Sequence, residues 1–255
     1  MSAKLSYSEM GIVKDTRIHR SDLNLGPGRD YIAVMSRISI RRVTVTLAVV
    51  TALLAVLGLV TQLRAPGETE LGTWAHVFNL DAEATLPAWF QAAMMLASGA
   101  LLWKIGSSGG PDNRFSRHWK FLAGVFVYLS ADESASLHET LGFWISEHFG
   151  WESSLGVYVW LIPALTLLVG LGIASWKFLR HLPPRIRWTM VIAAVVYVAG
   201  AAGMEVVEAL LDRLSGSLSF SMMTIVEETL EMAGLVVFIH ALLSYLKDLP
   251  DRGNL

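Results

Sequence analysis

Apolar runs separated by short polar segments set the pattern of this chain. A hydrocarbon core about 30 Å thick is crossed by roughly 20 residues of α-helix, so each run predicts one transmembrane helix. We therefore predict an all-α, polytopic membrane protein built as a six-transmembrane-helix bundle. The predicted helices are Val43–Leu63, Pro87–Ile105, Trp119–Phe143, Leu155–Phe178, Trp188–Leu211 and Phe220–Leu246.

The same pattern divides the chain into three parts. Residues 1–42 are polar and mixed in charge, which predicts a cytoplasmic N-terminal arm rather than a signal peptide. Residues 43–246 are predicted to form the six-helix membrane domain, and residues 247–255 a cytoplasmic tail. No fixed-period repeat and no two-halves symmetry of the transporter kind is visible, so we expect a single membrane domain.

The distribution of basic residues predicts how the helices are oriented in the membrane. Six crossings would place both termini on one side of the membrane, and that side carries nearly all the flanking Lys and Arg. By the positive-inside rule, we expect a multi-pass protein of the cell (inner) membrane with both termini in the cytoplasm. The terminal side holds Arg37, Arg41, Arg42, Lys104, Arg114, Arg117, Lys120, Lys177, Arg180, Arg185, Arg187, Lys247 and Arg252, against Arg64 and Arg213 opposite.

Amino-acid composition limits which partners the chain can bind and which side chains can hold a metal ion. The 255 residues are 53% hydrophobic and 16% charged, below the roughly 25% charged residues of soluble domains. A net charge of −2 argues against nucleic-acid binding, because proteins that bind nucleic acid carry basic surfaces. The apolar composition instead predicts that membrane lipids surround the chain. The chain has no cysteine, so any bound metal is held by carboxylate and imidazole groups.

Acidic residues interrupt three of the apolar runs. Ionisable groups at membrane depth are costly and mark a functional-site hypothesis. Because successive helices alternate in direction, all eight acids are predicted to lie in the half of the membrane away from the cytoplasm. They are Asp132, Glu133 and Glu139 on the third predicted helix, Glu205 and Glu208 on the fifth, and Glu227, Glu228 and Glu231 on the sixth.

Helical phase, at about 100° per residue, groups these side chains on faces. Asp132 and Glu139 share one face of the third predicted helix with Ser136 and Tyr128, whereas His138 lies beside it. The fifth and sixth predicted helices carry comparable stripes. Tyr197 lies below Glu205 and Glu208, Gly234 continues the line of Glu227, Glu228 and Glu231, and the small residues of Gly170–Gly172 and Ala199–Gly203 favour close helix contacts.

Charge balance predicts what the acids bind. No Lys or Arg occurs between Lys120 and Lys177, between Arg187 and Arg213, or between Arg213 and Lys247. Several ionised carboxylates cannot remain together in a low-dielectric slab without a counter-charge, so we expect one or two divalent metal ions. Acids near helix ends that simply face water, such as Glu133 or Glu228, are the alternative. The predicted ligands are Asp132, His138, Glu139, Glu205, Glu208, Glu227, Glu228 and Glu231.

Three functions are compatible with this site. The first is a membrane metalloenzyme acting on a lipid or other hydrophobic substrate. The ligand types are similar to those of carboxylate-bridged di-iron bundles, but the paired Glu-x-x-His motifs are absent, so iron, manganese and zinc are not distinguished. The others are a cation or proton transporter, for which the cytoplasmic helix halves offer almost no polar relay, and an accessory subunit of a larger membrane complex. A homo-oligomer is compatible with each.

Overall fold

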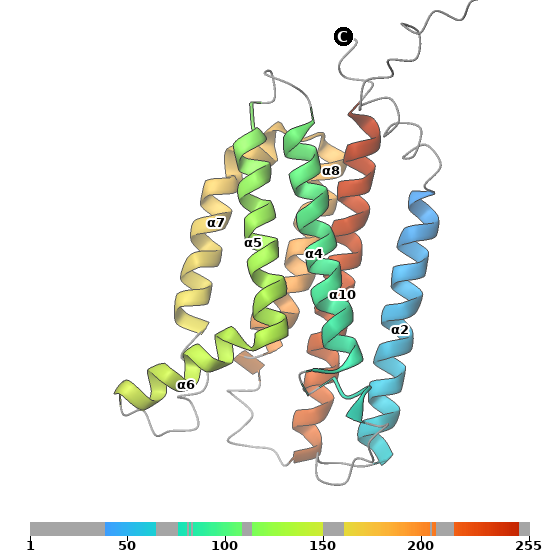
Figure 1. Cartoon of the computed structure of the whole chain (residues 1–255), viewed down its shortest axis with the longest axis vertical. Helices are drawn as coiled ribbons and strands as arrows, with labels where there is room; N and C mark the ends of the chain where they lie inside the picture. The colour runs from blue at the N-terminus through green and yellow to red at the C-terminus, as the bar shows by residue number, and fades with distance from the viewer. Residues whose placement is uncertain are drawn as a thin grey trace, which may run out of the picture. The chain divides into compact units, whose positions relative to one another are not determined.

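A computed structural model describes residues 39–64, 76–80, 82, 84–108, 114–149, 161–204, 206–207 and 217–249, and all regular structure within them is helical (Figure 1). The predicted arm at residues 1–42 falls mostly outside these ranges, as does most of the predicted tail. The helices are α2 (Ile40–Arg64), α4 (Leu86–Ser107), α5 (Ser116–Ala135), α6 (Leu137–Phe149), α7 (Leu161–His181), α8 (Pro184–Val198), the π-helix η5 (Ala199–Met204) and α10 (Ser217–Asp248).

Helix α10 is the centre of the packing. It lies against α2, α4, α8 and η5, and several of its apolar side chains, including Met232 and Leu242, are fully buried. Aromatic pairs join it to α5 as well. The ring of Phe126 stacks on Phe238 with centroids 4.7 Å apart. Because one helix contacts five of the other described helices, the side chains it carries into the core are brought close to residues far away in sequence.

In the described part of the chain, five helical segments are long and apolar enough to cross a membrane: Ile40–Arg64, Leu86–Ser107, Leu161–His181, Pro184–Met204 and Met222–Asp248. Their outer faces carry large exposed apolar side chains such as Leu167 and Ile173, each 73% exposed. A soluble protein does not leave such faces uncovered, so these helices indicate a membrane-embedded protein.

Helix α5 is the predicted crossing that does not meet this criterion. It begins with Arg117 and Lys120 and ends with Asp132 and Glu133, which lower its apolar character. Among the described residues, five helices are therefore candidates to cross the membrane, and the sixth crossing is not confirmed. In Figure 1, α5 nevertheless runs alongside α4 over a similar length.

The ends of three predicted helices are close to those observed. Helices α2, α4 and α10 begin and end within three residues of Val43–Leu63, Pro87–Ile105 and Phe220–Leu246. Helix α7 runs from Leu161 to His181, whereas residues 155–160 of its predicted span lie outside the described part. Apolar length therefore predicted these elements well.

The third predicted helix, Trp119–Phe143, is wrong as a single element. Ser136 adopts the left-handed conformation, with φ 48° and ψ 44°, and the chain turns there from α5 into α6. In Figure 1, α6 leaves the direction of α5 and runs outward past the end of α7, away from α4 and α10. The face predicted to join Asp132, Ser136 and Glu139 therefore does not exist, because helical phase is lost at Ser136. The serine-rich sequence here offers side-chain oxygens that compete with helical hydrogen bonds.

The fifth predicted helix changes from an α-helix to a π-helix before the sequence position of its acidic residues. Helix α8 continues as the π-helix η5 at residues 199–204. A π-helical turn shifts the phase of everything after it, so a constant 100° per residue does not relate Tyr197 to Glu205. The π-helix lies where α8 and η5 pack closely on α10.

Two glycines permit the close packing of α8 and η5 on α10, and one of them, Gly200, belongs to the predicted small-residue run Ala199–Gly203. A Cβ atom on Gly234 would lie 2.8 Å from the backbone nitrogen of Tyr197, and one on Gly200 would lie 2.8 Å from the carbonyl oxygen of Glu227. Gly170 and Gly172 differ, because a Cβ atom on either would meet nothing within 4 Å. The predicted close contact is therefore confirmed at Gly200, between η5 and α10, and not found for Gly170 and Gly172 of α7.

Candidate functional site

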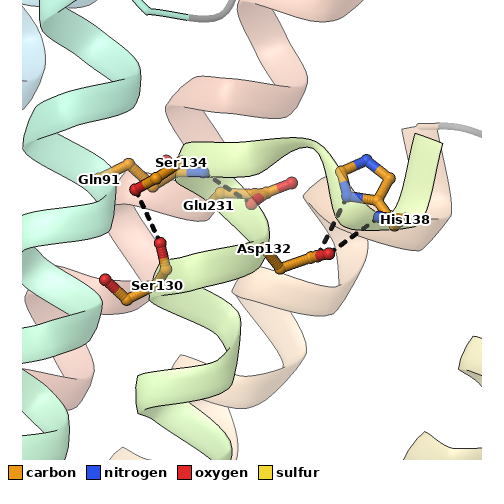
Figure 2. A network of polar contacts seen from close by, with 6 residues as sticks. All are labelled: Gln91, Ser130, Asp132, Ser134, His138 and Glu231. Carbon is orange, nitrogen blue, oxygen red and sulfur yellow. Dashed lines mark hydrogen bonds and ion pairs between the residues drawn. The ribbon is translucent and has the colours of Figure 1, made fainter. Parts of the chain in front are cut away.

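The candidate site is centred on Glu231 of α10. Its side chain is only 7% exposed, although it is a carboxylate in the middle of a helix bundle. The side-chain amide of Gln91, on α4, donates a hydrogen bond of 2.9 Å from Nε2 to Oε2 of Glu231 (Figure 2). The hydroxyl of Tyr197, on α8, is a second hydrogen-bonding partner. Glu231 thus joins three helices through neutral donors.

A second polar group lies at the turn between α5 and α6. Asp132 accepts a hydrogen bond of 2.9 Å from the backbone N–H of His138, and its other oxygen lies 3.1 Å from Nδ1 of the same histidine (Figure 2). The carboxylate therefore caps the first turn of α6, where the N–H groups of a helix lack internal partners. It also fixes the orientation of the imidazole ring.

One serine hydroxyl holds α5 against α4 beside this group, and a second bonds within α5. Ser130 donates a 2.9 Å hydrogen bond from Oγ to the carbonyl oxygen of Ala92, the residue after Gln91. Ser134 donates a 2.9 Å bond to the carbonyl oxygen of Ser130 (Figure 2). Because α4 is fixed to α5 here and Gln91 binds Glu231, the turn at Ser136 is held close to α10.

Charge interactions link Glu231 to the polar residues at the turn between α5 and α6. Glu133 and His138 both lie close enough to Glu231 to act on its charge, and Glu133 and Glu228 act in the same way on Tyr197. No Lys or Arg occurs in α5 after Lys120, in α6, in α8 after Arg187 or in α10 before Lys247. The site therefore combines acids with one histidine and lacks any permanent cation on these helices.

Five of the eight predicted ligands can be placed with their side chains. Glu231 is buried, whereas Asp132, His138, Glu227 and Glu228 are half-buried. Glu139 lies on α6, but its side chain is outside the described part, and Glu205 and Glu208 are outside it entirely. Within the residues whose side chains are described, no group of three or more His, Asp or Glu comes together in an arrangement that could hold a metal ion. The predicted metal site thus stays a prediction.

Sequence reasoning missed the partner of Glu231. Gln91 is 1% exposed, and its only sequence signal is that it is a long polar side chain within an apolar run. Of the two tyrosines on the predicted acidic faces, Tyr128 is 56% exposed, whereas Tyr197 contacts Glu231. Glu133, taken as a candidate for a water-facing acid, is half-buried and electrostatically coupled to Glu231.

Comparison with known proteins gives a family and no function. Residues 43–246 match the family described as "Domain of unknown function (DUF8692)", and the chain belongs to that family. No curated protein and no solved structure matches the chain.

Proposed function

Because the family carries no known activity, we propose from the site itself that this protein is a membrane metalloenzyme acting on a lipid or other hydrophobic substrate. The observation that carries the proposal is the buried carboxylate of Glu231, held by Gln91 and Tyr197 and facing further acids. A buried carboxylate that stays ionised needs a compensating positive charge. The helices around it supply no Lys or Arg, so a bound cation would meet that need.

The Asp132–His138 pair supports metal chemistry independently. Histidines that ligate metals through Nε2 commonly donate Nδ1–H to a carboxylate, which orients the ring and raises the basicity of the ligating nitrogen. The 3.1 Å contact between Nδ1 of His138 and Oδ2 of Asp132 has this form. In this proposal Asp132 orients His138, while Glu231 and the acids of α8–α10, including Glu205, Glu208, Glu227 and Glu228, complete the ligand set together with Glu139.

Gln91 adds a further polar atom to the site. Its Oε1 is buried and has no hydrogen-bond partner among the described residues, although Nε2 is bonded to Glu231. A buried carbonyl oxygen left unpaired costs about 1–3 kcal/mol. Amide oxygens and carboxylates suit divalent cations such as manganese, so a ligand at the site would satisfy this oxygen.

The surroundings of the site suggest the class of substrate. Glu231 lies among α4, α8 and α10, which carry three of the apolar crossings. A molecule that reaches the site between these helices has to enter from the lipid phase, which favours a hydrophobic substrate. Zinc would supply an activated water for hydrolysis, and iron or manganese would supply redox chemistry. In either case Tyr197, the hydrogen-bonding partner of Glu231, would act as the proton donor.

A cation or proton transporter is the second candidate, because a carboxylate with neutral partners can also bind a proton. The sequence of α10 disfavours it. From Met232 to Leu243 the helix is apolar except for His240, and Nδ1 of His240 lies 2.9 Å from the hydroxyl of Thr44 on α2. Such a helix provides no polar path from Glu231 to its other end.

Elemental analysis of the purified full-length protein tests the proposal. We expect stoichiometric iron, manganese or zinc, which a chelator removes with a fall in melting temperature and which added metal restores. At a metal concentration 100 times Kd, the stabilisation is about 2.7 kcal/mol. Glu231→Gln should abolish the response while keeping the side-chain shape. Glu147→Gln, an exposed acid on α6, is the matched control and should retain it.

Absence of stoichiometric metal, together with a Glu231→Gln variant more stable than the parent, would contradict the metalloenzyme. That result would show that the carboxylate is buried at a cost and binds a proton. The transporter, or an accessory role in a larger complex, would then explain the site better.

The proposal includes the membrane arrangement. We infer that α5 is the sixth crossing and that both termini are cytoplasmic. Twenty residues of α-helix rise about 30 Å, the thickness of the hydrocarbon core. The positive charges of α5 fall at its start and its negative charges at its end, so that both sets lie near the membrane surfaces.

A further inference from the structure

A basic pocket, shallow and open to its surroundings, lies where α7 ends and α5 begins, at the other end of α5 from the acidic site. It has a volume of about 340 Å³ and is lined by Arg114, Phe115, Lys177, Arg180 and His181. Four of these residues are basic and none is acidic. None of the four forms an ion pair with a described residue, so their charges are neutralised by no carboxylate in that part of the chain.

Aromatic packing holds the walls of this pocket in place. Phe178 of α7 is 1% exposed, and its ring contacts Trp119 of α5 with centroids 4.6 Å apart. The ring of Phe115 lies 5.7 Å from Phe178 and 4.9 Å from His181. The guanidinium of Arg114 lies 5.7 Å from the centre of the Phe115 ring. The basic groups therefore project from a rigid junction of two helices.

An apolar groove adjoins the pocket along α7. It is about 720 Å³ in volume and is lined by Val169, Gly172, Ile173, Ala174, Trp176 and Lys177, so Lys177 belongs to both hollows. Ile173 and Trp176 are 73% and 61% exposed. Gly172 keeps the floor open, since a Cβ atom there would meet nothing within 4 Å.

Two general effects explain why cations occur at this end, but not why they form a pocket. Basic residues complement the C-terminal dipole of a helix such as α7, and they accumulate on the cytoplasmic side of membrane proteins. Neither effect requires residues from two helices to converge on one concavity, or that concavity to open into an apolar groove through a shared lysine.

We propose that the pocket and the groove together bind one anionic phospholipid. Arg and Lys bind phosphate through charge-assisted hydrogen bonds, and basic pockets between membrane helices take anionic head groups. The phosphate lies in the pocket, and an acyl chain follows the groove on the exposed face of α7. Soluble phosphate compounds share the head-group chemistry, but only a lipid also fills the groove.

Lipid titration of the full-length, delipidated protein tests this assignment. Dioleoylphosphatidylglycerol is the probe and dioleoylphosphatidylcholine the comparison, and retained lipid is counted by native mass spectrometry. Lys177→Gln with Arg180→Gln should weaken phosphatidylglycerol binding about 5-fold for each charge removed. Arg117→Gln with Arg187→Gln removes the same charge near the same helix ends but outside the pocket, and should leave binding unchanged.

A second pair of variants, one a test and one a control, examines the groove. Gly172→Leu fills the groove without changing charge and should weaken binding of the two-chain lipid. Gly170→Leu adds the same side chain at an equally open position that does not line the groove, and should bind as the parent does.

Two results would overturn the proposal. Equal effects of the two double charge variants would show general surface attraction rather than a site. Displacement of phosphatidylglycerol by inorganic phosphate or glycerol 3-phosphate, with no effect of Gly172→Leu, would show a site for soluble phosphate compounds.

Discussion

At the scale of single residues, the contact between Gln91 and Glu231 is the decisive interaction. It joins α4 to α10 over 2.9 Å between two side chains that are almost completely buried. Hydrogen bonds to charged groups contribute about 1.5–3 kcal/mol, although bonds between membrane helices average about 0.6 kcal/mol. The value here depends on whether Glu231 carries its charge.

A double-mutant cycle measures this value. Gln91→Leu removes the donor, Glu231→Gln removes the charge, and the double variant removes both. We expect a coupling free energy of about 1–2 kcal/mol in thermal unfolding of the detergent-solubilised protein. The cycle is needed because Gln91→Leu also removes the unpaired Oε1, which offsets part of the loss.

The same cycle on a distant buried polar residue provides the control. Ser98 is buried, and its hydroxyl bonds to the carbonyl of Met94 within α4. Ser98→Ala combined with Glu231→Gln should give additive effects, because the two side chains share no partner. A coupling near zero for Gln91 as well would show that the bond to Glu231 contributes nothing.

At the scale of helices, Asp132 is expected to hold the start of α6. Asp132→Ala leaves the N–H of His138 without its acceptor and should destabilise the first turn of α6 by about 0.5–2 kcal/mol. Amide hydrogen exchange in residues 137–141 is the measurement, because the effect is local. Asp132→Asn keeps an acceptor and should cost less, and Glu147→Ala, farther along α6, should leave this exchange unchanged. Equal exchange in Asp132→Ala and the parent would contradict the capping role.

Close packing of α8 on α10 makes a second prediction at this scale. Gly234→Ala places a Cβ atom 2.8 Å from the backbone of Tyr197, so the helices have to separate. Overpacking of this kind costs about 1–3 kcal/mol. Gly124→Ala is the control, since its Cβ atom would meet nothing within 4 Å, and it should stabilise α5 by about 0.5–1 kcal/mol. Melting temperatures of the two variants should therefore move in opposite directions, and a shared direction would refute the packing argument.

The elements also show what sequence could and could not predict. Apolar length predicted α2, α4 and α10 because the membrane requires it. It did not predict the turn at Ser136, which depends on the capping of α6 by Asp132, or the π-helix η5, which follows from packing against α10. Phase arguments that crossed either point, such as the pairing of Asp132 with Glu139, therefore failed.

The site was predictable to a similar degree. Glu231 and Tyr197 stood out because polar groups are rare in apolar runs, and the structure brings them together. Gln91 was not predictable, because its partner is 140 positions away in the sequence and nothing in the spacing links them. Which acids share a site depends on how the helices pack, which a single sequence does not contain.

At the scale of the whole molecule, the number of crossings decides where the site opens. Five crossings would put the two termini on opposite sides of the membrane, whereas α5 as a sixth puts them on one side. The chain has no cysteine, so single cysteines can be introduced and labelled without background. Exposed positions are present at the required helix ends: Arg64 of α2, Ser107 of α4, Glu147 of α6 and Asp248 of α10.

A membrane-impermeant maleimide applied to intact cells should then separate these positions into two pairs. Arg64→Cys and Glu147→Cys should react from outside, whereas Ser107→Cys and Asp248→Cys should react only after permeabilisation. The pair that brackets α5 is decisive, because Ser107 precedes this helix and Glu147 follows it. If both react under the same condition, α5 does not cross, and the acids of α5 and α10 are no longer required to share one half of the membrane. Opposite reactivity instead places the Asp132–His138 group near the outer surface, where a metal could enter from outside the cell.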